Sequence, residues 1–99
     1  MALNGRNHPV ASQYPVEQQR EDSMKDMVRF IAEALADEPE HVEVVEIQGS
    51  HSTIVELKVA EGDRGKIIGR QGRTADAMRT LLKAAGRKVG KTYILEIID

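Results

Sequence analysis

Apolar residues recur at helical spacing from Ser23 onward. The positions that fall on one side of a helix are Met24, Met27, Val28, Ile31 and Leu35, with Ala32 beside them. Asp22 or Ser23 can serve as the N-cap, which accepts hydrogen bonds from free amides at a helix start. Pro39 is expected to close the helix, because the residue before a proline avoids the α region. The pattern predicts an amphipathic helix between Ser23 and Pro39.

Two stretches of valine and isoleucine follow. Residues 41–48 carry valines and an isoleucine between glutamates, and residues 53–59 alternate between polar and apolar side chains. The segment between them, Gly-Ser-His-Ser at 49–52, has the residue types of a turn. These features predict a β-hairpin.

The second half of the chain returns to helical spacing. Asp63 is a candidate cap for a short helix that ends at Ile68, and a second helix is expected from Thr74 to Ala85. Gly86 is placed to end that helix in a left-handed conformation. Residues 87–91 then form a short basic loop, and Thr92–Ile98 a largely buried strand.

The predicted order of elements is α-β-β-α-α-β. Three strands cannot bury their apolar face alone, so we expect the three helices to pack on one face of the sheet. The hairpin is antiparallel because its loop is short. The last strand follows a long helical crossover, which favours parallel pairing with the second strand. The fold class is therefore α+β with a mixed three-stranded sheet.

Composition indicates the extent of the folded domain and the compartment in which the protein is expected. Residues 1–22 show no usable periodicity and contain two prolines, so we interpret them as a flexible extension and 23–99 as a single domain. There is no cysteine among the 99 residues, which excludes disulfides and thiolate chemistry. No apolar run reaches membrane-spanning length and the N-terminus does not resemble a signal peptide. We expect a cytoplasmic protein.

Charge is divided unevenly along the chain. Residues 1–62 hold 5 Lys/Arg and 12 Asp/Glu, whereas residues 63–99 hold 9 Lys/Arg and 4 Asp/Glu, so −7 and +5 sum to the net charge of −2. A local cluster of cations steers an anionic ligand even when the whole protein is slightly acidic. A solvated helix face is the alternative explanation for such a cluster.

The basic half contains Gly69-Arg70-Gln71-Gly72, which follows an aliphatic pair and precedes a predicted helix. Glycine accepts positive φ and leaves no Cβ between the backbone and a ligand. A Gly-x-x-Gly turn at a helix start can therefore present N–H groups to a phosphate, which the helix dipole also favours. A tight connector between two helices would use the same residues.

The stretch Ile67-Ile68-Gly69-Arg70-Gln71-Gly72 resembles the Ile-Ile-Gly-x-x-Gly signature of KH domains. The preceding helix and hairpin resemble the type II arrangement of that fold. More narrowly, Gly-Lys-Ile-Ile-Gly-x-Gln-Gly-Arg-Thr at 65–74 resembles the small bacterial KhpA/YlqC proteins. The resemblance covers residues 23–99.

The resemblance implies that single-stranded RNA lies in a narrow groove, in which the loop clamps the backbone of about four nucleotides. Arg70 and Gln71 would contact phosphates, Lys66 and Arg73 would add charge, and one of the two isoleucines would form the floor. The last strand and residues 87–91 would form the opposite wall. The RNA-binding residues expected on this basis are Gly65, Lys66, Ile67, Ile68, Gly69, Arg70, Gln71, Gly72, Arg73, Arg87, Lys88 and Lys91.

The sequence gives little support for nucleotide binding by a P-loop, for a metal site or for base stacking on aromatic side chains. Gly62-x-x-Gly65-Lys66 is not a P-loop, because its glycines are too close and Ile67 stands where a Mg²⁺-binding hydroxyl is needed. The histidines, His8, His41 and His51, lack metal-ligand spacing. The chain has only three aromatic residues, so base stacking on aromatic platforms is not expected. We predict neither an enzyme nor a cofactor or metal.

Two functions remain open. The first is a single-stranded RNA-binding protein of low sequence specificity, either an RNA chaperone or a post-transcriptional regulator. The second is a protein-interaction module that acts through the acidic helix and hairpin or the N-terminal extension. The resemblance also implies a homodimer, or a heterodimer with a second KH-containing RNA-binding protein, and no membrane partner.

Overall fold

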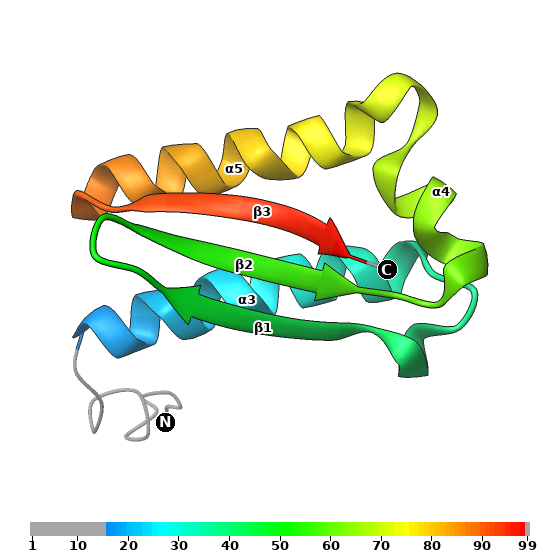
Figure 1. Ribbon diagram of the computed structural model, residues 1–99, viewed down its shortest axis with the longest axis horizontal. Helices are drawn as coiled ribbons and strands as arrows, with labels where there is room; N and C mark the ends of the chain where they lie inside the picture. Colours follow the sequence, from blue (N-terminus) through cyan, green and yellow to red (C-terminus); the bar gives the residue numbers. More distant parts are fainter. Residues whose placement is uncertain (1–15, 99) are drawn as a thin grey trace, which may run out of the picture.

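The three strands form one sheet in the order β1-β2-β3 (Figure 1). The computed structural model describes the backbone of residues 16–98 and the side chains of residues 23–98. Strands β1 (Glu43–Gln48) and β2 (Ser52–Lys58) pair antiparallel, with Val44 opposite Leu57. Strand β3 (Thr92–Ile98) pairs parallel to β2, with Leu95 opposite Val55. Both the hairpin and the parallel pairing are as predicted.

Three α-helices connect to this sheet: α3 (Val16–Leu35), α4 (Arg64–Ile68) and α5 (Arg73–Val89). Short 3-10 segments precede or join them: η1 (Pro39–His41), η2 (Glu61–Asp63) and η3 (Arg70–Gly72). The predicted α+β class and the order of helices and strands are confirmed. Within residues 16–98, no helix combines the length and apolarity needed to cross a membrane.

The helices cover one face of the sheet. Alternate strand residues point into the core, and they are Val44, Thr53, Val55, Leu57, Tyr93 and Leu95. Val28 and Ala32 of α3, Ile67 of α4, and Met78 and Leu82 of α5 meet them. In Figure 1, α3 lies behind β1 and β2, whereas α5 lies beside β3. Strand β3 is buried on this face alone, so the prediction of a largely buried strand was wrong.

Helix α3 differs from its predicted bounds at both ends. It begins at Val16 rather than at Ser23, because residues 17–21 are good helix formers even without an apolar face. Ser23 is therefore inside the helix and is not its N-cap. The helix ends at Leu35, which is 40% exposed, and Pro39 begins η1 instead of closing α3. Residues 1–15 of the predicted extension lie outside the described part of the chain.

Helix α5 passes through Gly86 and ends at Val89, so the predicted stop at Gly86 was wrong. Gly90 adopts the left-handed conformation at the C-cap, with φ 70° and ψ 29°. Gly86 is buried, and its carbonyl accepts a hydrogen bond from the Lys91 N–H at 2.9 Å. A Cβ at Gly86 would collide with the Lys91 carbonyl. The glycine is thus required by close packing, not by a turn.

Candidate nucleic-acid interface

Helix α4 carries the aliphatic pair that precedes the loop. Ile67 is fully buried in the core, whereas Ile68 is half-buried. The sequence could not decide which isoleucine enters the core, and the structure assigns that position to Ile67. Ile68 is the one placed beside the loop with part of its side chain accessible, as a groove floor requires.

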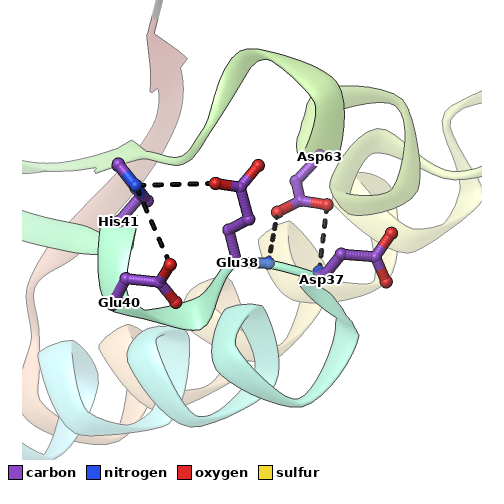
Figure 2. Close-up of polar contacts among 5 residues, drawn as sticks. All are labelled: Asp37, Glu38, Glu40, His41 and Asp63. Atoms are coloured by element: carbon purple, nitrogen blue, oxygen red, sulfur yellow. Dashed lines mark hydrogen bonds and ion pairs between the residues drawn. The ribbon is translucent and has the colours of Figure 1, made fainter.

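Asp63 fixes the start of α4 to the connection after α3. Its side chain is 2% exposed and accepts hydrogen bonds from the backbone N–H groups of Asp37 and Glu38, both at 3.0 Å (Figure 2). These two bonds lower the pKa of Asp63, and the charges of Lys66 and His41 act in the same direction against the effect of burial. Asp63 makes no capping bond to α4, so its predicted role as an N-cap was wrong. The Asp63 carboxylate is used instead by the two N–H groups of the connection between α3 and β1.

Lys66 reaches the same connection. Its ammonium group donates a hydrogen bond to the Asp37 carboxylate, and this bond raises the pKa of Lys66. Both side chains are largely exposed. Lys66 therefore differs from the other cations expected at the loop, since an RNA phosphate would have to compete with Asp37 for it.

Three residues of the loop between α4 and α5 have positive φ angles. Gly69 has φ 82° and ψ 167°, a conformation open to glycine, and Gln71 and Gly72 are left-handed with φ 58° and 75°. A Cβ on Gly69 would lie 2.8 Å from Thr74 Cβ and 2.9 Å from Thr74 N. A Cβ on Gly72 would meet no atom within 4 Å. Gly69 is therefore needed for the turn itself, and Gly72 leaves an open approach to the backbone.

The loop amides are not equally available. The Gly69 N–H donates to the Gly65 carbonyl at 2.8 Å, and the Gly72 N–H donates to the Gly69 carbonyl at 3.0 Å. Among the described residues, the N–H groups of Arg70 and Gln71 have no backbone acceptor. Gln71 adopts a left-handed backbone conformation, which is uncommon for a residue with a side chain. The donors available to a ligand thus belong to Arg70 and Gln71, not to the glycines.

Positive charge surrounds these donors. Arg70 and Arg73 are exposed, and in the described part of the chain neither forms an ion pair. The N-terminus of α5 follows directly after Gly72, so the positive end of its dipole adds to the field at the loop. The arrangement can hold an anion by backbone donors and two guanidinium groups together.

The second group of predicted residues lies at the other end of α5. Arg87 and Lys88 are in its last turn rather than in a loop, and Lys91 is in the turn to β3. At about 1.5 Å per residue, Arg87 lies roughly 21 Å along the helix from Arg73. The structure does not bring these residues to the Gly-x-x-Gly loop. Lys83, which was not among the predicted RNA-binding residues, lines a cavity with Arg87 and Lys91.

The structure also contains a small polar cluster that was not predicted from the sequence. His41 Nε2 lies 3.6 Å from Glu38 Oε1 and 3.9 Å from Glu40 Oε2 (Figure 2). All three side chains are exposed, and the ion pairs themselves account for their proximity. The 3-10 geometry of η1 brings them together, which no residue spacing in the sequence indicated.

Residues 25–97 match the family model for the KH domain of KhpA/KhpB. The chain belongs to this family. The match includes every predicted site residue, all of β1 and β2, and β3 as far as Ile97. It agrees with the prediction of a KH-domain protein rather than an enzyme.

Relatives of similar size support the family match over the same region. A protein of Caldanaerobacter subterraneus is 57% identical over 75 residues, which are 76% of this chain and 100% of the relative. One of Clostridium perfringens is 52% identical over 75 residues, with the same coverage. One of Aquifex aeolicus is 46% identical over 77 residues, which are 78% of this chain and 98% of the relative. Each of these relatives is named RNA-binding protein KhpA.

Proposed function

We propose that this chain binds single-stranded RNA through the loop between α4 and α5. The observation that carries the proposal is the pair of N–H groups at Arg70 and Gln71 that have no backbone acceptor among the described residues, beside the exposed side chains of Arg70 and Arg73. Backbone amides, helix dipole and cations converge there on one anion, as a phosphate requires. The names of the relatives support the same ligand class.

The contacts of this loop read the RNA backbone more than its bases. Residues 64–73 contain no aromatic side chain, and Tyr93 is only 7% exposed, so neither provides a stacking platform. Ile68 is the apolar surface beside the clamp. Low sequence specificity follows, which suits an RNA chaperone or a post-transcriptional regulator in the cytoplasm. RNAs of equal length and different sequence should bind with similar affinity.

The test of RNA binding is charge reversal at the loop. Arg70→Asp combined with Gln71→Asp should leave the far-UV circular dichroism spectrum unchanged and abolish binding to a fluorescent single-stranded RNA. Arg29→Glu combined with Ser50→Asp changes the net charge equally at exposed positions away from the loop, and it should bind as wild type does. Undiminished binding by the loop variant would refute the proposal.

A second candidate function, protein binding, is favoured by the uncovered face of the sheet. Ile47, Ile54 and Ile94 are neighbours on the three strands and form a row across that face. Ile47 and Ile94 are 45% and 43% exposed, and Val45 beside them is 51% exposed. In the next row, Glu56 pairs in register with Glu96, an arrangement of like charges that costs stability.

The chemistry of this face defines its partner. Isoleucines bordered by two carboxylates fit a protein surface with apolar side chains and a lysine or arginine opposite Glu56 and Glu96. A second copy stacked face to face would oppose four glutamates, so a homodimer would need another surface. The heterodimer with a second KH-containing protein is therefore the pairing we assign to this face.

Purified KH-containing proteins from the same genome provide the test. We expect one of them to bind the wild-type chain and to lose that binding with Glu56→Lys combined with Glu96→Lys. Glu33→Lys combined with Asp26→Lys on α3 makes the same charge change elsewhere and should have no effect. Sedimentation of the wild-type chain alone reports self-association. A dimer broken by Ile94→Ser would assign the face to a second copy instead.

A further inference from the structure

The far end of α5 carries a basic cavity that the loop does not use. Lys83 and Arg87, four residues apart on one side of the helix, line it together with Lys91, Thr92 and Tyr93. Its volume is about 250 Å³. Tyr93 is almost completely buried, so its ring forms the floor, while the lysine and arginine heads remain exposed at the rim.

Two of the cations that line this cavity, Lys83 and Arg87, are poorly compensated by the described residues. In the described part of the protein, neither Lys83 nor Arg87 forms an ion pair, whereas Lys66 is bound to Asp37 and Arg79 lies 3.5 Å from Asp76. Like charges four residues apart on a helix repel each other. An anion placed between Lys83 and Arg87 would relieve that repulsion.

The dipole of α5 does not explain all of these cations. Positive side chains are favourable in the last turn of a helix, which accounts for Arg87 and Lys88. The effect falls off within that turn, and Lys83 lies before it. Two carbonyls of the last turn are also already capped, by the N–H groups of Gly90 and Lys91. A separate reason is needed for Lys83.

Two cations of the cavity lie on one side of α5. Arg79, Lys83 and Arg87 follow one another at intervals of four residues, which places them on one stripe of α5, the helix that begins directly after the loop. This side faces away from α3, because the cavity that Met24 of α3 lines with α5 involves Ala85 and Val89 instead. Asp76 also lies on the stripe, but it is paired with Arg79. The cations of the stripe that have no ion pair in the described part of the chain are Lys83 and Arg87, at the end of α5 away from the loop.

We propose that the cavity lined by Lys83, Arg87 and Lys91 binds a phosphate of the same RNA strand, beyond the nucleotides that the loop clamps. Lys83 lies roughly 15 Å along the helix from Arg73, so loop and cavity must bind different nucleotides. The chain thus engages a longer RNA than the four or so nucleotides that a Gly-x-x-Gly loop clamps. This inference rests on the proposed RNA binding of the loop and extends it.

Oligonucleotide length separates the two sites. Labelled single-stranded RNAs of about four nucleotides and of about twice that length are titrated by fluorescence anisotropy at several salt concentrations. Wild type should bind the longer RNA more tightly, with a salt slope steeper by about 0.7 for each added phosphate contact. Lys83→Gln combined with Arg87→Gln should bind the short RNA as wild type does and lose the gain from length.

A matched control removes two charges elsewhere. Lys25→Gln combined with Arg29→Gln on α3 should keep the gain from length. The inference is overturned if wild type binds both RNAs equally, or if the Lys83 and Arg87 variant keeps the gain. A failure of the loop proposal has a different signature, because the short RNA would then bind equally well to the chain with Arg70→Asp and Gln71→Asp.

Discussion

Lys66, on the helix that leads into the loop, is held by the carboxylate of Asp37 in the connection after α3. The two residues are 29 positions apart in the sequence. One acidic group is therefore paired with a cation for which we propose a place next to RNA. The ion pair is exposed, so its effect on RNA binding should exceed its effect on stability.

Asp37→Asn should strengthen RNA binding. The substitution releases the Lys66 ammonium and removes a negative charge close to the loop, so the salt slope of binding should become steeper by about 0.7. Glu33→Gln removes an equal charge from α3 and should change binding less. If both variants bind RNA as wild type does, Lys66 makes no contact with the ligand.

Asp63→Asn should destabilise the fold near neutral pH. The two oxygens of Asp63 accept two backbone N–H groups, and the asparagine amide can accept only one of them. Chemical denaturation should show a lower midpoint than for wild type, whereas Asp26→Asn on the exposed face of α3 should show little change.

The same residue predicts a pH dependence. Its folded pKa is lower than the ordinary value of 3.8, so its contribution is complete above that value and is lost as the pH falls through the folded pKa. The difference in unfolding free energy between wild type and Asp63→Asn should shrink as the solution is acidified below about pH 4. A difference that stays constant down to strongly acidic pH would contradict the assignment.

The two glycines of the loop should not be equivalent. Gly69→Ala combines an unfavourable backbone conformation with a collision against Thr74, and we expect a loss of roughly 3 kcal/mol or more in unfolding free energy. Gly72→Ala meets open space and carries only the left-handed conformational cost of about 1 to 2 kcal/mol. Urea unfolding of both variants measures the difference, and equal losses would be inconsistent with this loop geometry.

Gly86 and Gly65 should respond differently to substitution by alanine, because Gly86 is closely packed and Gly65 is open to solvent. Gly86→Ala should lower the unfolding free energy by about 1 to 3 kcal/mol, because its Cβ would meet the Lys91 carbonyl and lie 3.2 Å from the Tyr93 ring.

A Cβ at Gly65 would meet no atom within 4 Å, so Gly65→Ala should leave the fold as stable or up to about 1 kcal/mol more stable. We expect Gly65→Ala to weaken RNA binding nonetheless, because its methyl group projects from α4 beside the loop. Normal RNA binding would place the strand away from Gly65.

The sequence was sufficient for features that depend on local periodicity. The hairpin, the parallel third strand and the Gly-x-x-Gly turn between two helices all follow from spacing and residue type. The limits of α3 and α5 did not. Residues 17–21 are helical without an apolar stripe that would indicate it, and tertiary contacts are involved at the C-terminal ends of both helices. Asp63 draws the N–H groups of Asp37 and Glu38 out of the helical pattern, and the approach of Lys91 requires a glycine inside α5.

The sequence predicted which segment forms the candidate site, but it did not predict which N–H groups of that segment are available to a ligand. Glycines at 69 and 72 indicated close approach of a ligand, yet their own N–H groups are used within the loop. Only the hydrogen bonds of the folded loop show that the amides without a backbone acceptor, among the described residues, are those of Arg70 and Gln71. The place of Arg87 and Lys88 on the last turn of α5 likewise depends on the helix continuing through Gly86.

The parallel pairing of β2 with β3 has a consequence for synthesis of the protein. The Gly-x-x-Gly loop lies inside the crossover that joins these two strands, and Leu82 and Met78 behind it pack on side chains of β3 and β2. Pairing across such a distance in sequence forms late in folding. A nascent chain that has not yet released Thr92–Ile98 from the ribosome lacks the strand that completes the sheet. The RNA clamp should therefore become competent only once this last strand is made, so that RNA binding reports a finished domain.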